Sequence, residues 1–133
     1  MTPETYASIA RTNSGTYPAR APFDPAFSYP EYDGPIAAEP NEVYAGVREA
    51  LRLAGLDAAR FDTPAWNPLG EWIQPGQFVL LKPNLVKETH PRDPGGWIYT
   101  ITHGSVIRAV ADYVWKALEG RGRVMVADAP QTD

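Results

Sequence analysis

The sequence contains no cysteine. A disulfide, a thiolate nucleophile and a zinc ion or iron–sulfur cluster bound through cysteine are therefore all excluded for this chain. No apolar run approaches the ~20 residues that a membrane-spanning helix needs, so we expect no membrane span. The first residues also lack a basic region followed by an apolar one, the pattern of a secretory signal. Together these absences predict a cytoplasmic protein.

Positive charge is scarce as well. Lys and Arg total 12 against 16 for Asp and Glu, which gives a net charge of -4. A nucleic-acid-binding protein needs a concentrated basic surface, so we expect no nucleic-acid partner. The length of 133 residues is sufficient for one domain with a modest hydrophobic core.

Residues 1–40 combine seven of the 14 prolines with six aromatic residues. Each proline fixes its own φ angle and disfavours helix at the residue before it, which predicts an extended N-terminal arm without regular structure. Composition leaves two interpretations open. The segment is a flexible tail, or its aromatic side chains lie across this domain or a partner. The aromatic residues are Tyr6, Tyr17, Phe23, Phe27, Tyr29 and Tyr32.

The first predicted helix runs from Asn41 to Gly55 and opens an α/β domain over residues 41–133. Asn41 is a favourable N-cap, Glu42 complements the helix dipole, and Gly55 is suited to ending the helix. An apolar stripe at helical spacing predicts the face that packs in the core, and the charged residues predict a solvated face. The stripe consists of Val43, Val47, Leu51 and Ala54, and the solvated face of Arg48, Glu49 and Arg52.

Two short apolar runs predict strands. Residues 78–81 are bounded by turn signals and predict a strand buried on both faces, and residues 123–128 predict a second buried strand. Between them a helix is expected to begin with Thr102 as its N-cap and Ser105 in its first turn. A strand, a helix and a strand in this order predict a parallel βαβ unit. The buried stripe of the helix is predicted as Ile107, Val110, Val114 and Leu118.

Because parallel strands end on the same side, both strand ends and the helix start should meet at one edge of the sheet, where α/β proteins bind ligands. The charge of Lys82 and the positive end of the helix predict a phosphate or carboxylate there. The polar residues expected at this edge are Lys82, Asn84, Thr102, His103, Ser105, Asp128, Gln131, Thr132 and Asp133. The predicted ligand-binding residues are Lys82, Asn84, Thr102, His103, Ser105 and Asp133.

Several roles stay open at this edge. Thr102 either donates its hydroxyl to the ligand or only caps the helix. Lys82 either acts as a base or anion ligand or is a salt-bridged lysine. Asp128 either binds a cation, a ribose hydroxyl or an amine, or simply starts a turn before proline. If the protein is an enzyme, Lys82 and Asp128 are the predicted catalytic residues, with Lys82 and His103 neutralising the anion. The sequence has no glycine-rich nucleotide-binding fingerprint.

A divalent metal is the candidate cofactor. His90 and His103 are the only histidines, and with Asp93 or Asp128 they would form a metal-binding triad. We predict Asp128 and His103 as metal ligands, although their spacing matches no compact metal motif. The alternative for His103 is a phosphate contact or a position beside the helix cap, where the helix dipole lowers its pKa.

Three motifs in order resemble the domain of unknown function 362. They are Lys82-Pro-Asn after the first strand, Thr102-His at the helix start and Asp128-Ala-Pro after the second strand. The resemblance covers about residues 65–133. The family typically has proline where this sequence has Gly104, so a residue suited to the first helical turn is lost. The family also has glycine where this sequence has Ala127, and this side chain is expected to crowd a ligand that approaches the backbone.

The resemblance also carries expectations about context. Some members of the family have a ferredoxin-like cluster domain, and this ending is most similar to members found among bacterial surface-polysaccharide genes. The family domain continues past the Asp-Ala-Pro motif, so the resemblance implies an incomplete doubly wound domain, belonging to a split or longer protein or to a truncated gene. The alternatives to anion binding are therefore a non-catalytic binding or redox-partner module that docks through its aromatic arm, and an inactive fragment.

Overall fold

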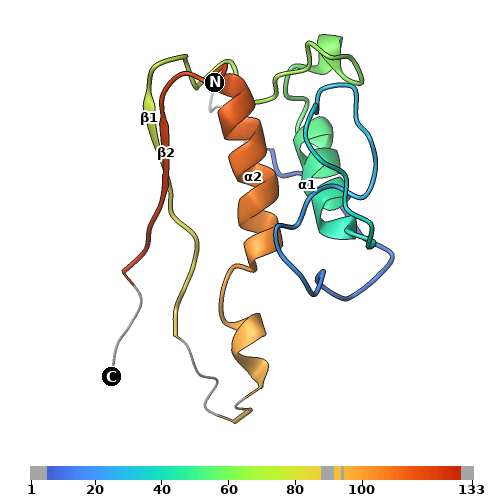
Figure 1. Ribbon diagram of the computed structural model, residues 1–133, viewed down its shortest axis with the longest axis vertical. Coiled ribbons are helices and arrows are strands. Elements are labelled where there is room, and N and C mark those ends of the chain that lie inside the picture. The colour runs from blue at the N-terminus through green and yellow to red at the C-terminus, as the bar shows by residue number, and fades with distance from the viewer. Residues whose placement is uncertain (1–5, 88–91, 94, 130–133) are drawn as a thin grey trace.

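The computed structural model of this chain describes residues 6–87, 92–93 and 95–129. The elements follow the order α1 (Glu42–Leu53), β1 (Phe78–Leu81), α2 (Gly104–Ala117) and β2 (Arg123–Val126), with short 3₁₀ helices at Ala58–Arg60 and Gly96–Tyr99. Figure 1 shows α2 lying between the sheet on one side and α1 on the other. The predicted mixed α/β fold is confirmed at this level.

The two strands pair in parallel, as predicted, and α2 is the connection between them. Phe78 is the register partner of Arg123, and Leu80 is the register partner of Met125. Hydrogen bonding continues for one residue past β2, where the Ala127 amide donates to the Leu81 carbonyl at 3.0 Å. The βαβ unit expected from the sequence is therefore present.

The predictions that β1 is buried on both faces and that β2 is a buried strand are wrong. Phe78, Leu80 and Met125 are 57%, 54% and 50% exposed, because α2 covers one face of the sheet and no described residues form a layer over the other. Uninterrupted apolar runs are typical of strands covered on both sides. We call the uncovered side, formed by Phe78, Leu80, Arg123 and Met125, the open sheet face.

Helix α1 begins and ends as predicted. The side chain of Asn41 accepts a hydrogen bond from the Tyr44 amide at 3.2 Å. At the other end Gly55 adopts a φ of +75°, and the amides of Gly55 and Leu56 donate to Arg52 and Leu51. This is the Schellman arrangement, which satisfies the last carbonyls of a helix with a left-handed residue, usually glycine.

The predicted core stripe of α1 needs correction. Tyr44 is the fully buried residue of the helix, Val47 and Leu51 lie beside it, and Ala54 is exposed. Arg48 was predicted on the solvated face, but its side chain is only 12% exposed and pairs with Glu31. The hydrophobic core forms between α1 and α2, and its buried members are Tyr44, Trp66, Ala109 and Tyr113.

The described part of the N-terminal arm packs on this helix pair (Figure 1). The Tyr29 and Tyr32 rings contact the ring of Tyr44, with centroids 6.1 and 5.8 Å apart. Arg48 donates two hydrogen bonds to Glu31, and Arg108 pairs with Asp24 at 2.8 Å. Of the two interpretations left open by composition, these contacts match an arm that lies across its own domain.

One residue joins the arm to the start of α1. The Asn41 side-chain amide donates to the carbonyls of Phe23 and Asp24 at 3.0 and 2.9 Å, while its oxygen caps the helix. Phe23 has a φ of +62°, which a bulky residue adopts only when its surroundings hold it there. Asn41 therefore fixes the arm at a strained turn.

No helix in the described ranges is long and apolar enough to cross a membrane.

Candidate functional site

Lys82 and Asp128 meet at the carboxyl ends of the two strands, as predicted. Lys82 Nζ lies 2.7 Å from Asp128 Oδ1, and Asp128 Oδ2 accepts a hydrogen bond from the Leu85 amide at 2.8 Å. The lysine side chain is 67% exposed and the aspartate side chain 5%. The hydrogen bond from Lys82, followed by that from Leu85, holds the pKa of Asp128 below its ordinary value. Asp128 is therefore ionised at neutral pH and holds the ammonium group of Lys82 in place.

Asn84 and Thr102 form a second pair. The backbone amide of Thr102 donates to the backbone carbonyl of Asn84 at 2.8 Å. The backbone amide of Asn84 in turn donates to Thr102 Oγ1 at 2.9 Å. Next to them, Leu85 and Ile101 form an isolated antiparallel bridge. Thr102 thus joins the segment after β1 to the segment before α2. The prediction that it caps α2 is wrong, because its hydroxyl oxygen is engaged across the loop.

His103 is the N-cap of α2. Its Nδ1 accepts a hydrogen bond from the Ser105 amide at 3.2 Å and lies 2.8 Å from Ser105 Oγ, and Ser105 is fully buried. Because Nδ1 is the acceptor for the amide, the neutral ring carries its proton on Nε2. Ser105 is therefore the second residue of α2. With Thr102 as the cap it would have been the third.

The arm covers the His103 ring. Tyr17 stacks on the ring with centroids 4.3 Å apart and an interplanar angle of 16°, and Phe23 lies at 5.2 Å on a tilted plane. Burial of the ring lowers the pKa of His103. The direction of this shift was predicted, but its cause is loss of solvent around the ring and not the helix dipole named at first.

Packing of the arm also explains the glycine after His103. A Cβ built on Gly104 would lie 2.9 Å from Phe23 Cε2, closer than real Cβ contacts come. The proline expected from the resemblance would bring its ring into the same space. Ala127, where the resemblance led us to expect crowding of a ligand, is exposed.

The predicted site residues thus form three local pairs: Lys82 with Asp128, Asn84 with Thr102, and His103 with Ser105. Three of the expected edge residues, Gln131, Thr132 and Asp133, lie outside the described residues, as does His90. Among the residues that the structure describes, no group of three or more His, Asp or Glu is placed to hold a metal ion. The metal-binding roles of Asp128 and His103 stay predictions.

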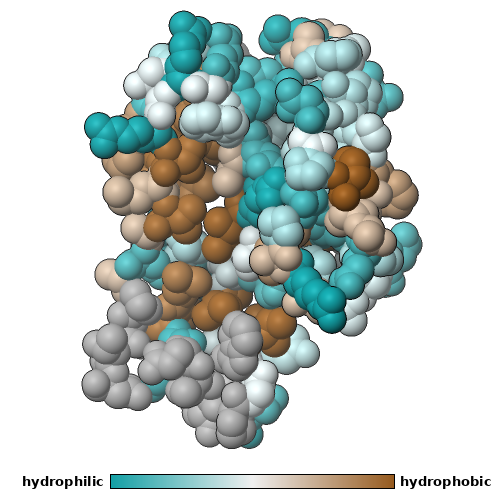
Figure 2. Space-filling model, viewed as in Figure 1, coloured by the Kyte–Doolittle hydropathy of each residue, from teal (hydrophilic) through white to brown (hydrophobic). Residues whose placement is uncertain are grey.

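A hollow of about 170 Å³ lies between the end of β1 and the first half of α2. Figure 2 shows apolar side chains gathering over the sheet and the neighbouring part of α2, where the surface is hollowed. Sequence reasoning assigned Ile107 and Val110 to the core and so missed the space beside them, which depends on how far apart the sheet and the helix lie. The residues that line the hollow are Leu81, Lys82, Pro83, Thr102, Val106, Ile107 and Val110.

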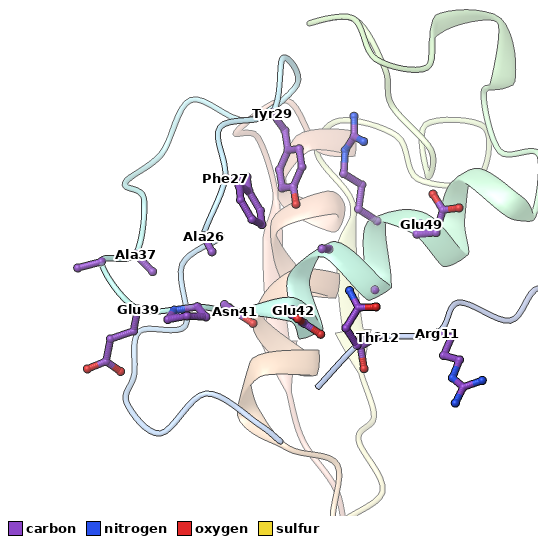
Figure 3. A pocket seen from close by; sticks show the side chains of 16 residues that line it. Arg11, Thr12, Ala26, Phe27, Tyr29, Ala37, Glu39, Asn41, Glu42 and Glu49 are labelled. Atoms are coloured by element: carbon purple, nitrogen blue, oxygen red, sulfur yellow. The ribbon is translucent and has the colours of Figure 1, made fainter. Parts of the chain in front are cut away.

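A second, larger cavity of about 630 Å³ lies between the arm and the start of α1 (Figure 3). It could not be found from the sequence because the arm forms one of its walls. In Figure 3, Arg11 and Glu39 lie on opposite sides of this cavity. Glu42 accepts a hydrogen bond from the Ser14 amide at 2.7 Å, and Glu49 pairs with Arg52 at 2.6 Å. Charges of both signs and carboxylates already engaged by the protein give this cavity no single ligand chemistry.

Comparison with known proteins gives no relative: no family model, no curated protein and no solved structure matches this chain.

Proposed function

We propose that this chain binds an anionic small molecule, a phosphate or a carboxylate, at the carboxyl edge of β1 and β2. The observation that supports the proposal is the position of Lys82, whose largely exposed side chain lines the hollow together with Thr102. Thr102 directly precedes the cap of α2, so one wall of the hollow lies next to the positive end of a 14-residue helix. A cation and a helix N-terminus at one place favour negative charge.

Asp128 serves as a positioning residue in this proposal. One of its oxygens contacts Lys82 and the other accepts the Leu85 amide, so both are engaged by the protein. A carboxylate held in this way orients the ammonium group of Lys82 and limits its conformations, which lowers the entropy cost of binding. Its predicted roles as base or metal ligand would require one of these two contacts to break.

Thermal unfolding with and without phosphate or acetate tests this proposal, because a ligand that binds only the native state raises its stability. We expect at least one of the two anions to raise the midpoint in the unaltered protein and in Lys82→Arg, but neither to raise it in Lys82→Met. Arg121→Met is a matched control, because Arg121 pairs with Glu119 at 2.7 Å and its side chain is 68% exposed, much as Lys82 pairs with Asp128. An equal response in Lys82→Met and Arg121→Met would contradict the proposal.

The open sheet face favours a second candidate function, a non-catalytic binding module. We propose as its partner an amphipathic helix with acidic side chains, because this face combines Phe78, Leu80 and Met125 with Arg123, and neither strand contains a carboxylate. The aromatic arm is a poorer docking element, since Tyr17, Phe23, Tyr29 and Tyr32 contact their own domain.

Methyl NMR signals of Leu80 and Met125 test this second candidate. A Leu/Glu amphipathic peptide should shift them more strongly than the same peptide with Lys in place of Glu. Equal shifts, or none, would count against it.

A further inference from the structure

We infer that the anion bound at the strand-end edge is a monocarboxylate with an apolar body of about six carbons, which occupies the hollow beside α2. This inference rests on the proposed anion binding and adds the class of ligand. It follows from three properties of the hollow: its walls, its polar groups and its size.

The walls are mainly apolar. Five of the seven lining residues are apolar, with Leu81 and Pro83 on the strand side and three residues of α2 on the other. An inorganic phosphate would leave these walls in contact with water or with its own charged oxygens. An apolar group in the same place removes hydrocarbon surface from water on both partners, which is favourable in proportion to the area buried. The three α2 residues are Val106, Ile107 and Val110.

The polar groups of the lining fit one carboxylate. Lys82 supplies an ammonium donor whose single positive charge is already paired with the Asp128 carboxylate at 2.7 Å. Thr102 Oγ1 accepts a hydrogen bond from the backbone amide of Asn84 at 2.9 Å. Its distance of 3.4 Å from the backbone carbonyl of Asn84 is long for a hydroxyl donor, so the hydroxyl hydrogen of Thr102 is available to a ligand. Two donors match the two oxygens of a carboxylate. A phosphate dianion has more oxygens and twice the charge, and it would face the Asp128 carboxylate with only one cation between them.

The size sets the length of the apolar body. A cavity of about 150 Å³ with aliphatic and aromatic walls accommodates benzene, which has six carbons. The hollow here is about 170 Å³. It therefore has room for a short alkyl chain or one ring, and a longer chain would extend into solvent.

Calorimetric titration of the unaltered protein with acetate, butyrate, hexanoate and decanoate tests the inference. We expect the affinity to rise about fourfold for each methylene that enters the hollow, equivalent to ~0.8 kcal/mol, and to level off once the apolar body reaches about six carbons, between hexanoate and decanoate. Hexanol and hexylamine should bind at least tenfold more weakly than hexanoate. Carboxylates that bind without dependence on chain length would overturn the inference and leave anion binding intact. Hexanol that binds as well as hexanoate, or no binding by any of these compounds, would overturn both.

Two variants test whether the ligand occupies the hollow. Val110→Phe fills the hollow and should weaken hexanoate binding at least tenfold while acetate binding changes little. Leu53→Phe adds a ring of the same kind at the exposed end of α1 and should leave both affinities unchanged. If Val110→Phe does not fold, chemical-shift changes in the methyl groups of Val106 and Ile107 on adding hexanoate give the same information. Shifts confined to other residues would overturn the assignment.

Discussion

Phe23 and Gly104 pack so closely that a side chain on residue 104 would collide with the Phe23 ring: its Cβ would lie 2.9 Å from Phe23 Cε2. The two residues are far apart in the sequence, one in the arm and the other the first residue of α2. The same Phe23 ring contacts His103, the cap of that helix. The start of α2, which forms part of the proposed site, is thus shaped by the arm.

The first prediction follows from this contact. Gly104→Ala should destabilise the protein by about 1 kcal/mol, because overpacking at the Phe23 ring outweighs the better helix propensity of alanine. In a Phe23→Leu background the same change should be neutral or stabilising, since the ring edge is gone. Chemical denaturation of the four proteins in this cycle measures the coupling. Additive effects of the two substitutions would show that the ring moves aside at no cost.

The second prediction concerns the buried ion pair that fastens the arm. Glu31, with a side chain only 1% exposed, receives two hydrogen bonds from Arg48 and one from the Tyr113 hydroxyl. Glu31→Ala should cost about 3–5 kcal/mol, because it leaves a largely buried guanidinium with only the exposed carboxylate of Asp62, 3.0 Å away, as its ion-pair partner. Glu49→Ala, which breaks the exposed pair with Arg52, should cost less than about 0.5 kcal/mol.

The rings around Arg48 allow a sharper test of that pair. Its guanidinium carbon lies 4.5 to 5.2 Å from the ring centroids of Tyr29, Phe61 and Trp66. In this apolar setting Arg48→Met combined with Glu31→Leu should recover most of the loss seen in Glu31→Ala, as replacement of buried pairs by apolar residues often does. A double variant as unstable as Glu31→Ala would show that the charges themselves are required.

The third prediction is a dependence of stability on pH. The pKa of His103 is lowered in the folded protein by burial, so between the folded value and the ordinary value of about 6.5 the unfolded chain binds more protons. Stability linked to this group is therefore fully present above about pH 6.5 and is lost as the pH falls through the lowered folded pKa. Protonation of Nδ1 removes a helix cap, an interaction of about 1 kcal/mol.

Unfolding free energies measured from pH 5 to pH 8 check this dependence against His103→Asn. Asparagine retains an N-cap acceptor but does not titrate, so the variant should be less sensitive to pH in the acidic part of the range. The side chains that contact the ring in the described part of the chain, those of Tyr17, Phe23 and Ser105, include no carboxylate and no amine. The same slope in both proteins would assign the dependence to other groups.

Local signals predicted much of this fold. The apolar run before Pro83 gave β1 its bounds, and the spacing of strand, helix and strand was enough to predict parallel pairing. Lys82 and Asp128 were expected together for the same reason, since both follow parallel strands. In each case the information lies in neighbouring residues or in the geometry that a connection of this length imposes.

Features that depend on contacts distant in the sequence were not predictable in this way. Arg48 is buried because of Glu31, which lies in a segment without periodicity. Thr102 lost its expected role as a cap because the Asn84 amide donates to its hydroxyl, and His103 capped the helix instead. The hollow beside α2 depends on the separation of two packed elements. Propensity and spacing describe none of these relationships, because each involves residues brought together only by folding.

The last prediction separates an exposed sheet face from one that is covered in solution. Leu80 lies on the open sheet face and is 54% exposed. Leu80→Thr should therefore change the free energy of unfolding by no more than about 0.5 kcal/mol, as surface substitutions usually do, and threonine keeps the preference for strand. Leu118→Ala, at a fully buried position just after α2, should cost about 2–5 kcal/mol by creating a cavity.

Chemical denaturation at two protein concentrations is the measurement for this comparison. A large loss in Leu80→Thr that grows as the protein is concentrated would mean that the face is buried between copies of the chain, because association stabilises the native state by mass action. A small loss independent of concentration would mean that Phe78, Leu80 and Met125 are open to water in the isolated chain. The acidic amphipathic helix proposed above would then meet a free surface, and its binding should raise the unfolding midpoint of the unaltered protein more than that of Leu80→Thr.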